Sequence, residues 1–439
     1  MTETKQQESP KTHRAVRWHP PSYDVRVEDV PFPKVEHPDD AIVKIALAGL
    51  CGSDLHIYRG HDVITKVHTS GHEFVGEVVA LGSNFLAVGG EQAASNGRPV
   101  LYSTLKVGDR VVSPFTVSCG ECRPCRQGFS SRCARSLLFG SPALEGGQAQ
   151  YVRVPYAGGT LFRLDDIKPD LATESRLTTL ADSSLLLLAD ILPTGYFAAL
   201  QLLQHPKLLP LLGGNPYPHT TLALSNPVGE AATSKDLLSI ALIGLGPVGI
   251  CAVVSLLDLL WKNGISYYRI IAIDPHEQRR NLIKAIYNKI LDANPTLNQK
   301  STFEAVDIET AKQRGFSADN AGFDGVIEAV GNTSAISLAF DLVRPFGVIT
   351  SVGVHQDQPL PMPGRALYGK NVSLDFGRCP VRSVFPLVLD LLVRRQDVFG
   401  EVGTETSLVD RIVGFDEAKV YYDLFDKGKC GKVLFDPWK

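Results

Sequence analysis

The sequence predicts an α/β protein that combines a β-rich lobe with a doubly wound parallel sheet. Three observations predict this fold: a glycine-rich turn at 244–249 follows an apolar, strand-like run, strand-like and helix-like segments alternate after it, and four cysteines cluster between residues 119 and 133. With 439 residues, the chain is long enough to bury one large core or two.

The composition is ordinary for a soluble globular protein. Hydrophobic residues make up 44% of the chain, charged residues 21%, and the net charge is −3. A charge so close to zero argues against nucleic acid as a partner. The first dozen residues are polar and of mixed charge, without the apolar core of a secretory signal, so the eight cysteines are expected in a reducing cytoplasm.

The cysteine cluster predicts a structural zinc site. Its spacing lets four thiolates surround one ion, and a closed shell of four thiolates leaves no position for a substrate. The first three cysteines also match the start of a ferredoxin cluster motif, but the fourth comes too late for it. Disulfides are the other alternative. The four residues are Cys119, Cys122, Cys125 and Cys133.

The glycine-rich turn predicts a dinucleotide-binding unit of the Rossmann type. An apolar strand at 238–243 precedes a G-x-G-x-x-G pattern, and the next strand, 269–274, ends in an acid. The helix that starts at this turn would face a pyrophosphate with its N-terminus. Asp274 would bond the ribose hydroxyls and repel a 2′-phosphate, which favours NAD over NADP, although Arg279 and Arg280 follow closely. The residues expected at the cofactor are Gly244, Gly246, Pro247, Val248, Gly249, Asp274, Val330 and Gly353.

Further alternation completes the predicted sheet. A strand at 323–331, a helix around 335–343 and a strand at 346–354 are typical of βαβ units. A glycine-rich turn in an unrelated α/β fold is the alternative. The uncharged run 239–257 has the length of a membrane span, but three glycines and a proline interrupt it, so a strand, a turn and a buried helix explain it better. The segment 432–439 is predicted to be a closing strand.

Three residues outside the cysteine cluster are candidates for a second metal site. Cys51 and His72 lie in glycine-bounded segments upstream, and Asp190 offers an oxygen donor downstream. A catalytic zinc needs about three protein ligands and one open position. A single Cys or His is more often a packing residue, so the joint occurrence of these residues with the other two motifs favours a second zinc.

With these motifs, the chain resembles the zinc-dependent alcohol dehydrogenases of the medium-chain dehydrogenase/reductase superfamily. The likeness runs from about Arg14 to the C-terminus, with the motifs in the family's order. It implies a GroES-like catalytic domain at 1–192, a Rossmann domain at 193–369 and a return to the first domain at 370–439, with catalysis in the cleft between the domains. It also implies two zinc ions per chain, a structural zinc at the cysteine cluster and a catalytic zinc held by Cys51, His72 and Asp190.

The resemblance implies that hydride passes between an alcohol or aldehyde substrate and NAD. The metal would favour loss of the alcohol proton near neutral pH, and Ser53 and His56 would carry this proton away. Glu73 would lie behind the metal and approach it transiently. Asp54 would orient His72 through its ring N–H.

Other positions indicate the branch of the family and leave questions open. Phe115 resembles a residue that lines the substrate pocket, with an ordinary core aromatic as the alternative. Asp190, and Gly52 where ethanol-type enzymes carry an arginine, favour the polyol and formaldehyde dehydrogenase branches. An aldehyde dismutase that retains NAD and a non-catalytic descendant are the alternative functions. Compared with the family, the chain has apparent insertions at 83–106 and 205–236. The resemblance implies a homodimer or homotetramer. No membrane partner is expected.

Overall fold

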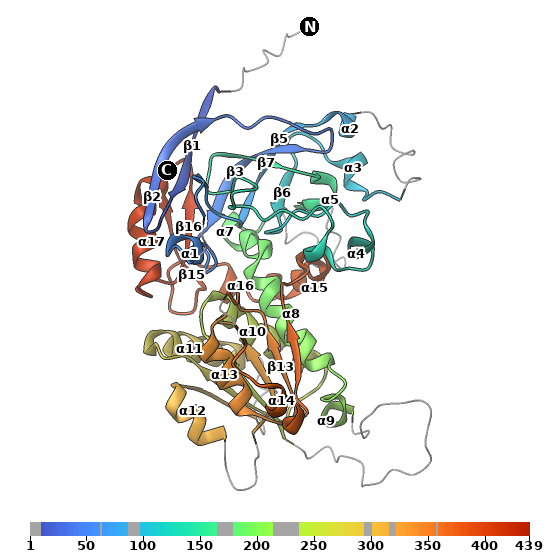
Figure 1. Ribbon diagram of the computed structural model, residues 1–439, viewed down its shortest axis with the longest axis vertical. Helices are drawn as coiled ribbons and strands as arrows, with labels where there is room; N and C mark the ends of the chain where they lie inside the picture. Colours follow the sequence, from blue (N-terminus) through green and yellow to red (C-terminus); the bar gives the residue numbers. More distant parts are fainter. Residues whose placement is uncertain are drawn as a thin grey trace. The chain divides into compact units, whose positions relative to one another are not determined.

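The computed structural model describes residues 10–61, 64–86, 97–164, 179–213, 237–293, 301–315, 322–356 and 359–439 (Figure 1). Its internal contacts divide the chain into two compact units. One comprises Met1–Asp190 and Pro380–Lys439, and the other comprises Ile191–Cys379. The two predicted insertions are described only in part, because residues 87–96 of the first and 214–236 of the second lie outside the described residues.

The first unit is built on two β-sheets. A seven-stranded sheet has the order β15-β16-β3-β5-β6-β8 with β7 paired to β3, and a three-stranded sheet has the order β2-β1-β4. The strands are β1 (Thr12–His19), β2 (Asp24–Pro31), β3 (Ala41–Gly49), β4 (His68–Thr69), β5 (Phe74–Leu81), β6 (Arg110–Ser113), β7 (Tyr151–Val154), β8 (Phe162–Arg163), β15 (Val409–Gly414) and β16 (Lys432–Asp436).

Short helices connect these strands, and the C-terminal segment supplies the longer ones. They are α1 (Asp54–Tyr58), α2 (Ser83–Leu86), α3 (Leu101–Thr104), α4 (Arg123–Arg126), η2 (Ser130–Arg132), α5 (Ala157–Thr160), α7 (Asp182–Leu185), η4 (Leu186–Ala189), α15 (Val381–Arg394), α16 (Gln396–Phe399), η6 (Phe415–Glu417) and α17 (Ala418–Asp426). Strand β16 pairs antiparallel with the end of β3, so the returning chain completes the sheet that carries the candidate site.

The second unit is a doubly wound parallel sheet. Its six strands have the order β11-β10-β9-β12-β13-β14, which is 3-2-1-4-5-6 in sequence order, the arrangement of dinucleotide-binding folds. The elements are α8 (Ile191–Gln204), α9 (Leu209–Gly213), β9 (Leu238–Ile243), α10 (Pro247–Lys262), β10 (Tyr268–Ile273), α11 (Glu277–Ala293), β11 (Thr302–Val306), α12 (Ile308–Gly315), β12 (Phe323–Glu328), α13 (Thr333–Leu342), β13 (Val343–Ser351), α14 (Gly364–Lys370) and β14 (Ser373–Phe376).

Helices cover both faces of this parallel sheet. Successive residues of a strand point to opposite faces. On one face, a Cβ at Gly325 would lie 2.7 Å from Leu202 of α8. On the other face, the next residue, Val326, belongs to one buried cluster with Ile336 of α13. Strand β9 is buried at all six positions, as expected for a central parallel strand. The predicted α/β class, with a β-rich unit and a doubly wound sheet, is therefore confirmed.

The uncharged segment 239–257 folds as predicted, as strand β9, a turn and the buried first part of α10. Within the described ranges, no single helix is long and apolar enough to cross a membrane. One bent pair, Asp182–Ala189 followed by Ile191–Gln204, meets the length and composition criteria together.

Candidate active site and metal centres

Adjacent antiparallel strands bring Cys51 and His72 together. Strand β3 ends at Gly49, two residues before the cysteine, and β5 begins at Phe74, two residues after the histidine. Ala48 lies opposite Phe74 in the register of these strands. Because the two strands meet at the same end of the sheet, the segments that leave them lie side by side.

Asp190 joins these two residues from the end of the 3₁₀ helix η4. Its Oδ2 lies 3.7 Å from Cys51 Sγ and 3.4 Å from His72 Nε2. With zinc–sulfur bonds of about 2.3 Å and zinc–nitrogen or zinc–oxygen bonds of about 2.0–2.2 Å, tetrahedral ligands lie about 3.4–3.8 Å apart. Both separations from Asp190 meet this test, and all donor atoms of the group, including an oxygen of Glu73, lie within 4.8 Å of one another.

Asp54 and Ser53 complete the surroundings of His72. The ring Nδ1 lies 3.1 Å from Asp54 Oδ1, which fixes the tautomer whose Nε2 lone pair faces the donor group. The other oxygen of Asp54 accepts the Cys51 N–H at 3.0 Å, so one carboxylate holds both ligand segments. The Ser53 hydroxyl lies 3.4 Å from Cys51 Sγ and 3.1 Å from His72 Nε2.

A buried lysine, which the sequence interpretation missed, is the ion-pair partner of Glu73. Lys432, the first residue of β16, is 0% exposed and bonds to Glu73 Oε2. The other oxygen of Glu73 is buried and has no hydrogen-bond partner among the described residues. A lysine directly before the apolar run VLF of β16 was the one signal in the sequence for this pair. Lys432 therefore balances the charge of a carboxylate that stands beside the metal donors.

Burial and neighbouring charges shift the pKa values of this group. Burial raises the pKa of the Cys51 thiol, and the nearby Glu73 raises it further. Burial lowers the pKa of His72, but Asp54, Asp190 and Cys51 together outweigh this effect and raise the pKa well above its ordinary value. Burial also raises the pKa of Glu73, against the effect of Lys432. A bound dication stabilises thiolate and neutral imidazole, so this cluster suits a metal better than protons.

Phe115 and His56 lie in the same unit as the donor group. The ring of Phe115 stands edge-on to that of His72 with centroids 6.4 Å apart, and its backbone N–H bonds to Ala189 O, directly before Asp190. His56 lies in α1, and its ring is 6.0 Å from that of His61. Gly52 is exposed, and a Cβ there would meet no atom within 4 Å.

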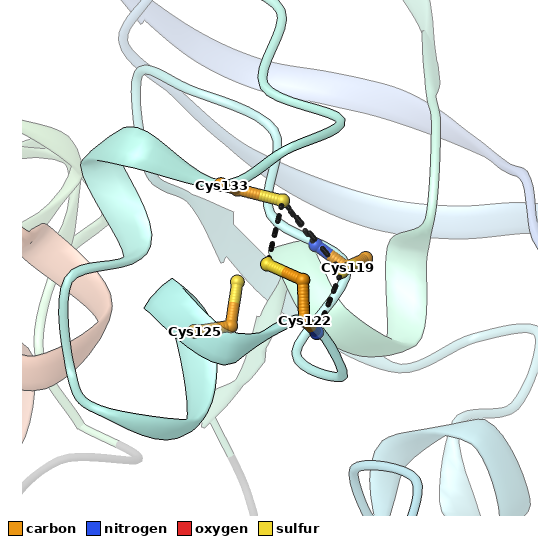
Figure 2. Close-up of side chains that lie close together, drawn as sticks. All are labelled: Cys119, Cys122, Cys125 and Cys133. Atoms are coloured by element: carbon orange, nitrogen blue, oxygen red, sulfur yellow. Dashed lines mark hydrogen bonds between the residues drawn. The ribbon is translucent and has the colours of Figure 1, made fainter.

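The four clustered cysteines form the second group of donors. Figure 2 shows their side chains gathered around the start of α4, which begins directly after Cys122. Cys133 Sγ lies 3.6 Å from Cys119 Sγ and 3.8 Å from Cys122 Sγ, and all four sulfurs lie within 4.8 Å of one another. All eight cysteines are free thiols, which excludes the disulfide alternative in this structure. Four thiolates on one zinc need separations of about 3.8 Å, so the cluster fits the ion.

Backbone N–H groups support these sulfurs. Glu121 and Cys122 donate to Cys119 Sγ at 3.4 Å, and Cys119 and Arg135 donate to Cys133 Sγ at 3.3 Å. For Cys122, burial raises the thiol pKa, but hydrogen bonds from Ala134 and Cys125 lower it to about 6. Such N–H groups stabilise thiolates, the form that binds metal.

The glycine-rich turn has the geometry expected at a phosphate-binding loop. Gly244 has a φ of +93°, and a Cβ on Gly249 would lie 1.8 Å from Gly244 O, so neither position accepts a side chain. A Cβ on Gly246 would meet nothing within 4 Å, which leaves room for a ligand against the backbone. Pro247 and Val248 open α10, whose first N–H groups face this loop.

Asp274 follows β10 and is buried against the same loop. Its carboxylate accepts the backbone N–H of Leu245 at 2.8 Å and that of His276 at 2.8 Å. Arg279 lies 3.4 Å from this carboxylate, and Arg280 donates to the Asp274 carbonyl. Both arginines are therefore engaged with the segment that carries the acid.

Val330 and Gly353 lie on two loops joined by a buried carboxylate. Glu328 Oε1 accepts the N–H groups of Val330 and Gly331 at 2.7 and 2.8 Å, while its Oε2 accepts the Ser351 hydroxyl at 2.6 Å and contacts His355 Nε2 at 3.0 Å. These loops leave the carboxyl ends of neighbouring parallel strands, where ligands of such sheets bind. This network was not predicted from the sequence.

Comparisons with known proteins agree with this architecture. Residues 37–166 match the family model "Alcohol dehydrogenase GroES-like domain", and residues 247–394 match "Zinc-binding dehydrogenase". The zinc-type alcohol dehydrogenase B of Aspergillus flavus is 36% identical over 422 residues, which cover 96% of this chain and 81% of that protein. The formaldehyde dismutase of Pseudomonas putida is 30% identical over 442 residues, which cover 94% of this chain and 95% of that protein.

A solved structure matches nearly the whole chain. The alcohol dehydrogenase of Thermus sp. ATN1 has a TM-score of 0.68 and 28% sequence identity, and the match covers 96% of this chain and 99% of that one. The family models, the relatives and the fold agree with the resemblance predicted from the motifs, and that prediction is confirmed. The chain belongs to the zinc-dependent alcohol dehydrogenases of the medium-chain dehydrogenase/reductase superfamily.

Proposed function

We propose that this protein is an NAD-dependent oxidoreductase that interconverts alcohols and aldehydes at a zinc site formed by Cys51, His72 and Asp190. The observation that carries the proposal is the convergence of these three donors beside a serine hydroxyl. Asp190 Oδ2 lies 3.7 Å from Cys51 Sγ and 3.4 Å from His72 Nε2. Two anionic ligands and one neutral histidine would balance the charge of a zinc ion. When bound, the ion would supply Lewis-acid stabilisation of the substrate oxygen.

Ser53 and His56 are proposed to move the substrate proton. Ser53 Oγ lies 3.1 Å from His72 Nε2, close enough to touch a substrate oxygen held at the same donors. A serine hydroxyl accepts one hydrogen bond while it donates another, so it can relay a proton that it does not keep. His56, three residues further on in α1, would receive the proton and release it towards solvent.

Phe115 and Glu73 are proposed to shape the site around the reacting atoms. The Phe115 ring, edge-on to His72, offers an apolar wall for the substrate carbon. Glu73, paired with Lys432, would lie behind the metal, approach it transiently and leave one coordination position for substrate.

NAD is the proposed cofactor, held by the Gly244–Gly249 turn and the loops that carry Val330 and Gly353. Asp274 is proposed to face the adenosine ribose and to disfavour a 2′-phosphate by charge repulsion. This part of the proposal predicts a higher kcat/KM with NAD than with NADP. Faster turnover with NADP at equal concentration would contradict it.

A panel of alcohols and aldehydes, monitored through NADH absorbance, tests the main proposal. Zinc is counted per chain in the same preparations, with two ions expected, one of them at the cysteine cluster. Cys51→Ser is expected to remove turnover and one zinc while the fold, followed by circular dichroism, is retained. Unchanged alcohol oxidation by Cys51→Ser would overturn the assignment.

A dismutase is the second candidate, favoured by the formaldehyde dismutase among the relatives. Such an enzyme oxidises one aldehyde, as its hydrate, to the acid and passes the hydride through the retained NAD to a second, unhydrated aldehyde, which becomes the alcohol. It would convert aldehyde to equal amounts of acid and alcohol without added cofactor, and NAD would be recovered from the denatured purified protein. Dependence on added NAD would favour the dehydrogenase.

A further inference from the structure

We infer that Gln148 is a positioning residue that holds the segments of Cys51 and His72 at the separation needed for one metal ion. The inference rests on the proposed zinc site, and it concerns a residue that contacts neither zinc ligand through a hydrogen bond. Gln148 lies just before β7 and is 0% exposed.

The backbone of Gln148 is fixed to the segment that leads into His72. Its N–H donates to Ser70 O at 3.0 Å, and its carbonyl accepts the Val16 N–H at 2.8 Å. Gly71, with a φ of +90°, packs against its side chain so closely that a Cβ on the glycine would lie 2.4 Å from Gln148 Cγ. The residues just before His72 therefore rest on Gln148.

The side chain of Gln148 reaches the segment that leads into Cys51. Its Nε2 donates to the carbonyl of Gly49, the last residue of β3, at 2.9 Å, and lies 3.5 Å from Asp54 Oδ2. Its Oε1 accepts the hydroxyl of Tyr422, a residue of α17 that is 1% exposed, at 2.8 Å. Because a carbonyl only accepts, the amide has a single orientation that satisfies Gly49 and Tyr422 together.

These contacts make one buried amide the bridge between both ligand segments and Asp54, which orients His72. Metal geometry tolerates displacements of only about 0.5 Å at the ligands. Loss of the amide would remove the donor to the buried Gly49 O and the acceptor of the Tyr422 hydroxyl, and the segments would relax to satisfy these groups. We therefore expect weaker metal binding at the Cys51 group, with the cysteine cluster unaffected.

Gln148→Met tests the inference, because methionine keeps the unbranched shape against Gly71 but removes both side-chain hydrogen bonds. Gln150→Met is the matched control. Gln150 lies two residues further along the same segment, and its side chain accepts the Arg14 N–H and donates to Pro437 O, both at 3.1 Å. Gln150→Met loses two side-chain hydrogen bonds, and Gln148→Met loses those to Gly49 and Tyr422 and the 3.5 Å contact with Asp54. Of the two residues, Gln148 is the one that joins the ligand segments.

The readout is the rate of zinc release from the holoprotein to a chromogenic chelator. The kinetic phase of zinc release that is absent from the Cys51→Ser variant is assigned to the Cys51 group. We expect Gln148→Met to accelerate this phase roughly 10- to 100-fold, the usual effect of losing a group that orients metal ligands, and Gln150→Met to change it less than about twofold. Turnover should fall in Gln148→Met and not in Gln150→Met. Equal release rates in the two variants would overturn the inference.

Tyr422→Phe keeps the inference testable if Gln148→Met does not fold. It removes only the donor to Gln148 Oε1 and should accelerate the same phase to a smaller extent; an unchanged phase would contradict the inference. If the unaltered protein has no release phase that depends on Cys51, the proposed function fails. If that phase exists and none of the Gln148 contacts affects it, only the positioning role fails.

Discussion

The cysteine cluster draws all four donors from residues 119–133, whereas the Cys51 group joins residues that lie up to 139 positions apart in the chain. The cluster is also more exposed, because Cys122 and Cys125 are only partly buried while Cys51 and His72 are buried. In the cluster, backbone N–H groups of the same loop support the sulfurs. In the Cys51 group, side chains from distant segments provide that support.

This difference indicates that the two donor groups of one unit would use the proposed zinc ions for two purposes. Four thiolates of a single loop fill the coordination shell and stabilise the local fold without much surrounding core. A mixed set with an open position depends on precise placement, and the structure supplies it with buried polar residues: Asp54, Glu73, Lys432 and Gln148. Predictions that separate the two groups follow, ordered by the size of the effect.

The largest effect is expected from Asp190→Ala. Without the oxygen ligand, the Cys51 group should lose its zinc, so turnover should fall by several orders of magnitude while the cluster keeps its ion. Zinc per chain and kcat measure this. Asp182→Ala, which removes the partly exposed partner of Arg110 in α7, is the control and should retain turnover and both ions. Equal turnover in the two variants would mean that Asp190 is no ligand.

The next largest effect is expected from Lys432→Met. It leaves Glu73 buried without its partner, and breaking a buried ion pair costs about 3–5 kcal/mol of unfolding free energy. Urea unfolding of the holoprotein measures the loss. Lys427→Met removes an exposed pair with Asp423 and should cost at most about 1 kcal/mol. Adding Glu73→Gln to Lys432→Met should restore part of the stability; no restoration would show that the charge of Glu73 is not what Lys432 balances.

Cys122→Ser should lower the free energy of unfolding by roughly 2–3 kcal/mol, because the loop loses a metal ligand. It should affect turnover much less than Asp190→Ala does. Thermal unfolding and kcat at low temperature distinguish the two effects. The control is Cys430→Ser, because Cys430 is a partly buried cysteine that lies outside both donor groups. Loss of turnover as complete as that of Asp190→Ala would show that the two centres do not have separate tasks.

The smallest effect concerns Glu328, a buried carboxylate that lies in the parallel-sheet unit and outside both donor groups. Burial raises its pKa, but hydrogen bonds from His355, Ser351 and the Gly331 N–H outweigh this and lower the pKa below its ordinary value of 4.5. The carboxylate therefore adds stability above that pH, and this stability is lost as the pH falls through the lowered pKa.

Glu328→Gln should consequently lower the free energy of unfolding by about 1–3 kcal/mol at pH 7, and this difference from the unaltered protein should shrink below about pH 4.5. Thermal unfolding at several pH values measures it, with the exposed Glu309→Gln as the control. If the loss of unfolding free energy stays constant with pH, the charge of Glu328 does not contribute to stability. For Glu73, by contrast, the charge is expected to affect stability.

Much of this architecture could be predicted from local patterns. The cysteine spacing, the glycine-rich turn after an apolar strand and the alternation that follows it each lie within a few tens of residues, and the sheet order 3-2-1-4-5-6 agrees with them. The donors Cys51, His72 and Asp190 were candidates by residue type and were assigned as ligands through the family resemblance, and the structure brings them together.

Other residues could not be predicted from such patterns. Lys432, Tyr422 and Gln148 carry no local motif. Lys432 and Tyr422 reach their partners only when the C-terminal segment returns to β3 and to the residues before His72, and Gln148 bonds to Gly49, which lies 99 positions away in the chain. The network around Glu328 likewise depends on the register of two neighbouring parallel strands.

By itself, the sequence determined the α/β class, the family and the residue types able to hold zinc, because ligand chemistry and short-range spacing are written along the chain. Tertiary structure decided the contacts that hold the ligands of the Cys51 group beyond the Asp54 bond to His72, which the resemblance implied. Burial makes an unpaired charge or an unsatisfied amide costly, so the partners of Glu73 and Gly49 must come from wherever the fold places a complementary group, however distant it is in sequence.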